Sequence, residues 1–143
     1  MSAPSGVLAA LTSTPTTIRL SLHVLAATIW IGGQFTLAGL LPTLRSLGPE
    51  ATRRAARAFS RLAWPAYAAL VATGLWNIAA DHPTSKSSSW HVALGVKIGV
   101  VALAGLATLA HQTSKKKAVI AIGGAVASLA SVAALVLGVL LAG

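Results

Sequence analysis

The chain alternates between long apolar stretches and short polar connections. Four apolar stretches stand out, at about residues 18–41, 62–80, 90–111 and 118–142. Each holds about 20 residues or slightly more, the length of helix that crosses the hydrocarbon core of a bilayer. The period-two alternation of barrel strands is absent, and backbone groups in lipid must be satisfied internally. The stretches are therefore predicted to be transmembrane helices.

The connections between these stretches fix the predicted topology. Residues 42–61, 81–89 and 112–117 form connections so short that consecutive helices must run antiparallel. The predicted fold is all-α: a polytopic membrane protein built as an antiparallel four-transmembrane-helix bundle, with residues 1–143 as a single membrane domain. Pro42 is expected to end the first helix, because proline lacks the N–H that a helix interior needs.

Composition agrees with a membrane protein. The chain is 55% apolar and only 9% charged, whereas about a quarter of the residues in a soluble domain are charged. Zero cysteines and a single methionine remove disulfides, thiolate metal sites and thioether sites for Cu(I). The first 15 residues lack the basic region of a signal peptide. We expect a short polar tail followed by an uncleaved first span.

The basic residues are distributed unequally between the two ends of the predicted bundle. Of 11 lysines and arginines, five arginines lie in residues 42–61 and three lysines in residues 112–117, while Arg19 and Lys86 lie at the opposite end. The positive-inside rule places the two basic connections in the cytoplasm and both termini outside the plasma membrane. The net charge of +9 does not indicate nucleic-acid binding, because it is not gathered on one exposed face.

One basic stripe is predicted to lie on a cytoplasmic amphipathic helix at about residues 50–61. Arg53, Arg57 and Arg61 recur every four residues there and so share one helix face. The stripe is interpreted either as a binding site for anionic lipid headgroups or as a solvated face that anchors the topology.

A row of small residues in the last span predicts close helix packing. Gly123, Ala127 and Ser131 are spaced by four residues, which lets two backbones approach closely in lipid. Packing within the bundle is one interpretation, and a homodimer interface is the other.

Three polar positions within the spans stand out, because polar side chains are costly in lipid. At about 1.5 Å per residue, His23 lies about 7 Å and Lys97 about 10 Å from the same end of the bundle, and Asn77 is near that end of the second span. Antiparallel packing predicts that the three form one layer in the outer half of the membrane. Trp30 shares a helix face with His23, and Trp30 and Trp90 are expected to line the pocket.

Each of these residues also has a purely structural interpretation. Lys97 could extend its ammonium toward the headgroups, and a neutral His23 could bond to a neighbouring helix. The two acidic residues, Glu50 and Asp81, both lie outside the spans, so chemistry by paired carboxylates is not available. Enzymatic activity is not indicated, although a haem-dependent oxidoreductase is left open, as is a structural subunit without catalysis.

Short motifs in the first three spans resemble the CopD domain of copper-resistance membrane proteins (copper resistance protein D). They are His23-x₆-Trp30-x-Gly32-Gly33, Thr73-Gly74 and the lone Lys97.

This resemblance implies a role in copper transport or homeostasis, with the His/Lys site in the outer leaflet. A Cu(II) ion would use His23 with His91 or His82, since imidazole suits copper. The same pattern also resembles the HemJ-type protoporphyrinogen oxidases, in which a histidine and a lysine at the positions of His23 and Lys97 are associated with haem binding. That alternative implies haem b, which needs one or two axial ligands and an apolar slot. Copper and haem b both remain open, with Asn77 and Trp30 as further cofactor-binding candidates.

Overall fold

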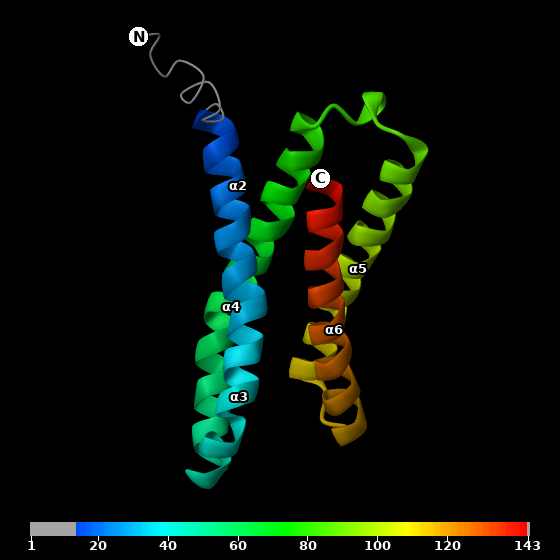
Figure 1. Cartoon of the computed structure of the whole chain (residues 1–143). Coiled ribbons are helices and arrows are strands. Elements are labelled where there is room, and N and C mark those ends of the chain that lie inside the picture. The colour runs from blue at the N-terminus through cyan, green and yellow to red at the C-terminus, as the bar shows by residue number, and fades with distance from the viewer. Residues whose placement is uncertain (1–13, 143) are drawn as a thin grey trace.

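The computed structural model describes residues 14–142, and within that range the secondary structure is helical throughout. The expected polar tail falls in residues 1–13 and therefore lies outside the described part. The elements, in chain order, are α2 (Thr14–Ala27), the π-helix η1 (Thr28–Gly32), α3 (Gly33–Ser46), α4 (Pro49–Ala80), the 3₁₀ turn η2 (Pro83–Ser85), α5 (Ser88–Thr113) and α6 (Lys117–Ala142) (Figure 1).

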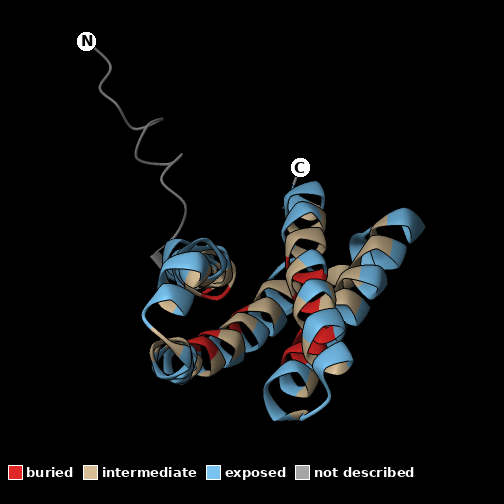
Figure 2. Ribbon diagram, turned by 90° about the horizontal axis from the view of Figure 1, so that it is seen from below, coloured by how far each residue is buried: buried red, intermediate tan, exposed pale blue. Residues whose placement is uncertain are grey.

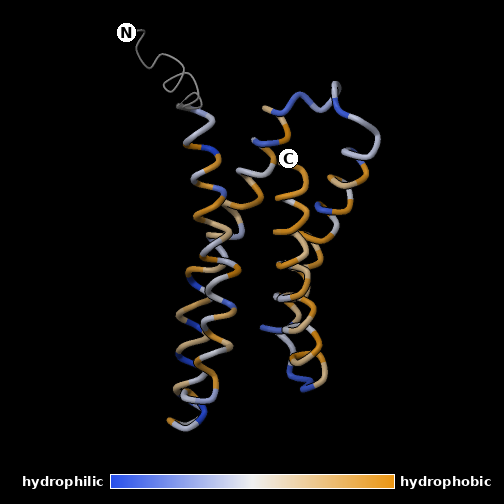
Figure 3. Tube along the Cα trace, viewed as in Figure 1, coloured by the Kyte–Doolittle hydropathy of each residue, from blue (hydrophilic) through white to orange (hydrophobic). Residues whose placement is uncertain are grey.

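Four helical rods are long and apolar enough to cross a membrane. The first comprises α2, η1 and α3 without interruption, and the others are α4, α5 and α6. Hydrophilic residues gather at both ends of the molecule, and the rods between them are largely hydrophobic (Figure 3). The predictions of an all-α fold and of four membrane-spanning helices are confirmed, and the protein is a multi-pass membrane protein by this criterion.

The rods form two helical hairpins. One hairpin pairs the first rod with α4, and the other pairs α5 with α6 (Figure 1). The start of α2, the end of α6 and the connection through η2 lie at one end of the bundle, called here the terminal end. The connections from α3 to α4 and from α5 to α6 lie at the other, called here the basic end.

The prediction that Pro42 ends the first helix is wrong. The helix continues through Pro42 to Ser46. A proline in a helix removes one N–H and frees the carbonyl four residues earlier, but here it lies about one turn from the helix end. Water at the end of a membrane helix can solvate the freed carbonyl, so the chain can stay helical.

The predicted basic helix and the second span are one continuous helix. Helix α4 runs for 32 residues from Pro49 to Ala80, with Pro65 inside it. Gly48 precedes it with φ of 99°, a backbone conformation that favours glycine. The basic residues therefore extend from the membrane-spanning part of α4 on a rigid helix.

Buried residues lie in short stretches of the helices, and most of each helix surface is intermediate or exposed (Figure 2). The buried apolar residues are small with one exception, and many large apolar residues are exposed. Trp30 is the exception among the buried apolar residues, which are otherwise alanines. Such packing is expected where lipid, not water, surrounds the helices, because close backbone contact then drives association. On α6 the row Gly123, Ala127 and Ser131 is buried within the chain. A side chain at Gly123 would lie 3.0 Å from the Ala107 carbonyl oxygen. The homodimer remains a prediction.

Candidate functional site

Three aromatic residues of the first hairpin form a cluster in the middle of the bundle. The ring centroids of Trp30 and Tyr67 are 4.7 Å apart, those of Trp64 and Tyr67 5.8 Å, and those of Trp30 and Trp64 5.9 Å. Two of these pairs are edge-on, a geometry that aromatic rings favour. We call these three residues the aromatic joint.

Each polar tip of the aromatic joint donates a hydrogen bond to the second hairpin. Trp30 Nε1 donates to Ser131 Oγ at 3.0 Å. Trp64 Nε1 donates to Gln112 Oε1 at 2.9 Å, and the Tyr67 hydroxyl donates to the Val101 carbonyl at 2.8 Å. The joint therefore fastens the two hairpins together.

Local backbone features support this joint. Trp30 lies in the π-helical turn η1, and such turns change the direction in which side chains leave a helix. Gly105 of α5 leaves room for the Tyr67 hydroxyl, because a side chain there would overlap it. Gln34, one turn beyond Trp30, adds a bond accepted from Ser128 Oγ at 3.3 Å. Trp30 and Gln34 thus use their shared face for contact with α6.

His23 lies nearer the terminal end and is held by α4. Its Nδ1 is 2.7 Å from the hydroxyl of Thr73, which is itself 2.6 Å from the Ala69 carbonyl. A threonine hydroxyl has one proton. The carbonyl can only accept, so that proton goes to Ala69 and the hydroxyl accepts from Nδ1–H. This leaves Nε2 with a free lone pair, and Nε2 makes no hydrogen bond within residues 14–142.

Lys97 is on α5. The ammonium lies against α6, where a side chain at Gly138 would be 3.1 Å from Nζ. Lys97 is only partly exposed, and it forms no ion pair or hydrogen bond with residues 14–142. That His23 and Lys97 form one site remains a prediction. A half-buried cation is expensive in a membrane helix, so Lys97, which has no partner among residues 14–142, is a candidate functional residue.

Asn77 does not bind His23; the contact is made by Thr73, one turn away on α4. The backbone carbonyl of Asn77 accepts from Arg19 Nη1 at 3.2 Å, and Arg19 Nη1 is 3.9 Å from a carboxylate oxygen of Asp81. The side-chain Oδ1 of Asn77 is buried and has no partner among residues 14–142. Arg19 is 6% exposed, so the arginine predicted at the head of the span is a buried residue between α2 and α4.

Trp90 and His91 lie apart from this layer in their contacts. Trp90 is at the start of α5, where its ring packs edge-on against His91 at 5.3 Å and Lys86 Nζ lies 5.7 Å from its centroid. His91 is exposed, and its Nδ1 is 2.9 Å from the Ser87 carbonyl of its own helix start. His82 is also exposed, in the connection that contains η2. Trp30 belongs to the aromatic joint and not to a wall shared with Trp90.

Metal ligands are not clustered in the described chain. Residues 14–142 contain no group of three histidine, cysteine, aspartate or glutamate side chains that could hold an ion. His111, the fourth histidine, lies at the basic end, with Nδ1 2.6 Å from the Ile120 carbonyl. Any metal at His23 would therefore rely on this one imidazole and on ligands of another kind.

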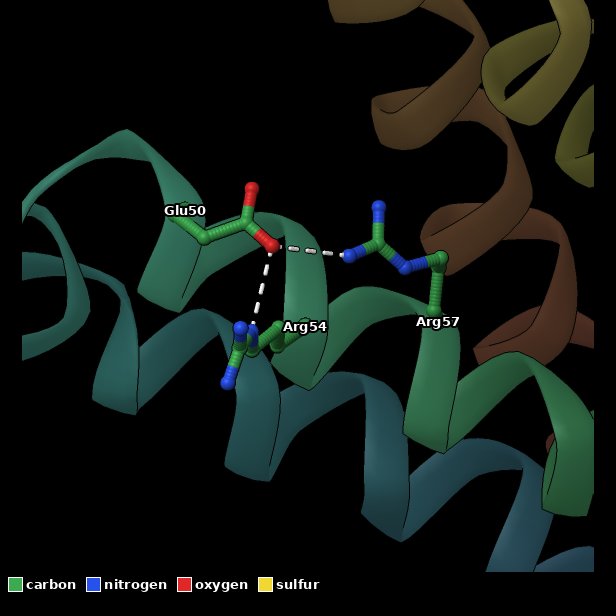
Figure 4. Close-up of polar contacts among 3 residues, drawn as sticks. All are labelled: Glu50, Arg54 and Arg57. Atoms are coloured by element: carbon green, nitrogen blue, oxygen red, sulfur yellow. Dashed lines mark hydrogen bonds and ion pairs between the residues drawn. The ribbon is translucent and has the colours of Figure 1, made fainter.

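At the basic end, Glu50 pairs with two arginines of its own helix. One carboxylate oxygen is 3.1 Å from Arg54 Nε and 3.0 Å from Arg57 Nη2 (Figure 4). All three side chains are well exposed, so the pairs contribute little to stability. Arg57 thus has a carboxylate partner, whereas Arg53 and Arg61 do not. Headgroup binding by Arg53, Arg57 and Arg61 remains a prediction.

The residues that the sequence pattern missed are Arg19 and the partners of the aromatic joint. Thr73 was visible as a polar residue on the face of Asn77, but nothing in the pattern distinguished the two. Comparisons with known proteins identify no relative, since no family model, curated protein or solved structure matches the chain. The function is therefore argued from the geometry.

Proposed function

We propose that this is a membrane-embedded haem b-binding protein, with His23 as an axial ligand and Lys97 beside the same site. The observation that carries the proposal is the hydrogen bond from His23 Nδ1 to Thr73, which leaves Nε2 free. Histidines that bind metals are commonly fixed in this way through the other ring nitrogen. Bound there, haem would supply one-electron redox chemistry.

Haem fits the available side chains better than copper does. A haem iron needs one or two axial ligands, because the porphyrin supplies the other four. Lys97 offers a cation, either for a porphyrin carboxylate or, when deprotonated, as a second ligand. A copper ion asks for several ligands from the protein, and His91 makes its contacts within its own helix start. Copper transport, implied by the CopD resemblance, is the second candidate.

We place the protein in the plasma membrane with both termini outside, which puts the site in the outer leaflet. The support is the gathering of basic residues at the basic end. The chain has no cysteine, so a single cysteine introduced for Ser87 reports on one position only. Labelling of Ser87→Cys by an impermeant maleimide from outside is expected. Labelling only from the cytoplasmic side would contradict the orientation.

The cofactor is tested by the absorption spectrum and the metal content of the protein purified in detergent. We expect a Soret band that His23→Ala abolishes and that His91→Ala, the matched exposed histidine, leaves unchanged. Near-stoichiometric copper without a Soret band would reject haem and favour copper. Neither copper nor haem, with normal folding of His23→Ala and Lys97→Ala, would favour a structural subunit.

A further inference from the structure

A second feature lies between α2 and α4 and meets the histidine site at Thr73, the residue that contacts His23. An apolar groove of about 240 Å³ runs along these two helices. Leu22 is its residue nearest the terminal end on α2, and Thr73 is the nearest on α4. Ala69 of α4 lines the groove one helical turn from Thr73.

Charged and polar groups stand directly beyond the groove. Arg19 is three residues before Leu22 and Asn77 is four residues after Thr73, so each lies one helical turn farther toward the terminal end. These two residues are joined by the bond from Arg19 Nη1 to the Asn77 carbonyl. The groove thus ends under a polar head made by the same two helices.

The polar head has both signs of charge and unused hydrogen-bonding groups. The Arg19 side chain is 8% exposed and that of Asp81 46% exposed, with 3.9 Å between their charged atoms. Only Nη1 of Arg19 is engaged with residues 14–142, so further N–H donors of this cation are free. The buried Oδ1 of Asn77 is an acceptor without a donor.

We propose that the groove and its polar head bind one phospholipid whose headgroup carries a phosphate and a primary ammonium, as in phosphatidylethanolamine. An acyl chain occupies the groove, and Arg19 donates to the phosphate. The ammonium donates to the half-exposed carboxylate of Asp81. Charge-assisted bonds of this kind are stronger than neutral ones.

The charges of the polar head favour this headgroup over two others. A phosphatidylcholine headgroup has the same charges but no N–H to donate to Asp81. A phosphatidylglycerol headgroup has a phosphate without a cation, so it leaves Asp81 facing a negative charge. The preference should therefore depend on both Arg19 and Asp81.

The test is native mass spectrometry of the detergent-purified full chain, equilibrated with equimolar ethanolamine, choline and glycerol phospholipids of identical acyl chains. We expect the ethanolamine lipid to be retained about tenfold over the choline lipid, the effect of roughly one charge-assisted contact. Equal retention of these two lipids would overturn the proposal. Preferential retention of the glycerol lipid would overturn it in favour of an anionic lipid.

Variants of the polar head test whether the preference for the ethanolamine lipid depends on it. Asp81→Asn should remove the ethanolamine preference and raise retention of the glycerol lipid. Asparagine keeps the shape of the half-exposed Asp81 side chain and removes the negative charge that lies 3.9 Å from Arg19. Arg19→Gln should lower retention of all three phospholipids, because each carries the phosphate that Arg19 binds. Lys86→Gln, which removes an exposed cation at the same end, should change nothing. An unchanged preference in Asp81→Asn would overturn the proposal.

A bulky side chain introduced into the groove tests whether the acyl chain binds there. Ala69→Trp should lower retention of all three lipids together, because the indole takes the place of the acyl chain. His23→Ala should leave the lipid preference intact, so loss of the Soret band and loss of the lipid preference are separate results. Full lipid retention in Ala69→Trp would overturn the assignment of the groove.

Discussion

The aromatic joint and the polar layer at the terminal end use similar residues to different effect. In the joint, the polar tips of Trp30, Trp64 and Tyr67 all have partners on the opposite hairpin. In the layer, Lys97 has no partner among residues 14–142 and Asn77 Oδ1 is buried without one. Polar groups buried without partners cost free energy, so packing alone explains the joint and leaves the layer unexplained.

This difference separates structural from functional polar residues within one membrane domain. Helix association in lipid uses close packing and interhelical hydrogen bonds, and the joint provides both. A residue that serves only stability should raise stability by its presence. A residue kept for a ligand can be present at a cost, which the ligand offsets when it binds.

The largest expected effect is the loss of the joint in Trp30→Ala. Trp30 is 3% exposed, and its replacement leaves a cavity between the hairpins and removes the hydrogen bond from Trp30 to Ser131. The free energy of unfolding should fall by about 3–5 kcal/mol, measured by reversible unfolding in mixed micelles. The control is Trp76→Ala, because Trp76 of α4 is 47% exposed; its effect should stay within about 0.5 kcal/mol. Equal effects would show that the joint does not hold the hairpins.

Thr73→Val should affect the ligand more than the fold. Valine keeps the shape of threonine but cannot accept the proton of His23 Nδ1. Haem affinity, measured by titration of the apoprotein, should fall by about 10- to 100-fold. The matched control is Thr108→Val, because the buried Thr108 hydroxyl bonds only to the Ala104 carbonyl of its own helix. An equal loss in both variants would mean that Thr73 acts through helix packing.

Lys97→Met should stabilise the fold while it weakens the site. The variant removes a half-buried cation without a partner and keeps an unbranched side chain of similar length. The free energy of unfolding should rise by about 1–2 kcal/mol in the absence of ligand. Unfolding of the apoprotein in mixed micelles measures this gain, and the Soret band measures the loss of haem. If Lys97→Met instead lowered the free energy of unfolding, Lys97 would have a structural role, as the residues of the aromatic joint do.

The sequence pattern predicted the membrane spans because apolar run length alone decides them. It also predicted that His23 and Lys97 share a layer, since depth follows from the helical rise along antiparallel helices. It could not choose between Thr73 and Asn77 as the partner of His23. These residues are one turn apart on one face, and the choice depends on how α2 and α4 cross.

The two prolines and the π-helix show a second limit of the sequence. Pro42 and Pro65 lie inside helices, although proline usually marks a helix end. In lipid the helix is the only way to satisfy most of the backbone, so the helix continues past a single missing N–H. The π-helical turn at η1 shifts the directions in which the later side chains of the first rod point. The sequence TIWIG contains no residue that predicts such a turn. The contacts of Trp30 with Trp64 and Tyr67 could therefore be found only from the three-dimensional structure.

Ser128→Ala tests the edge of the joint, where the smallest effect is expected. The Ser128 hydroxyl donates to Gln34 Oε1 at 3.3 Å, a long bond that joins α6 to α3. Hydrogen bonds between membrane helices contribute about 0.6 kcal/mol on average, so the loss of stability should not exceed that value. The same unfolding assay measures it, with the Soret band as a second readout that should not change. A change in that band would mean that the polar layer extends to Gln34, and the boundary between joint and layer would then lie closer to the basic end.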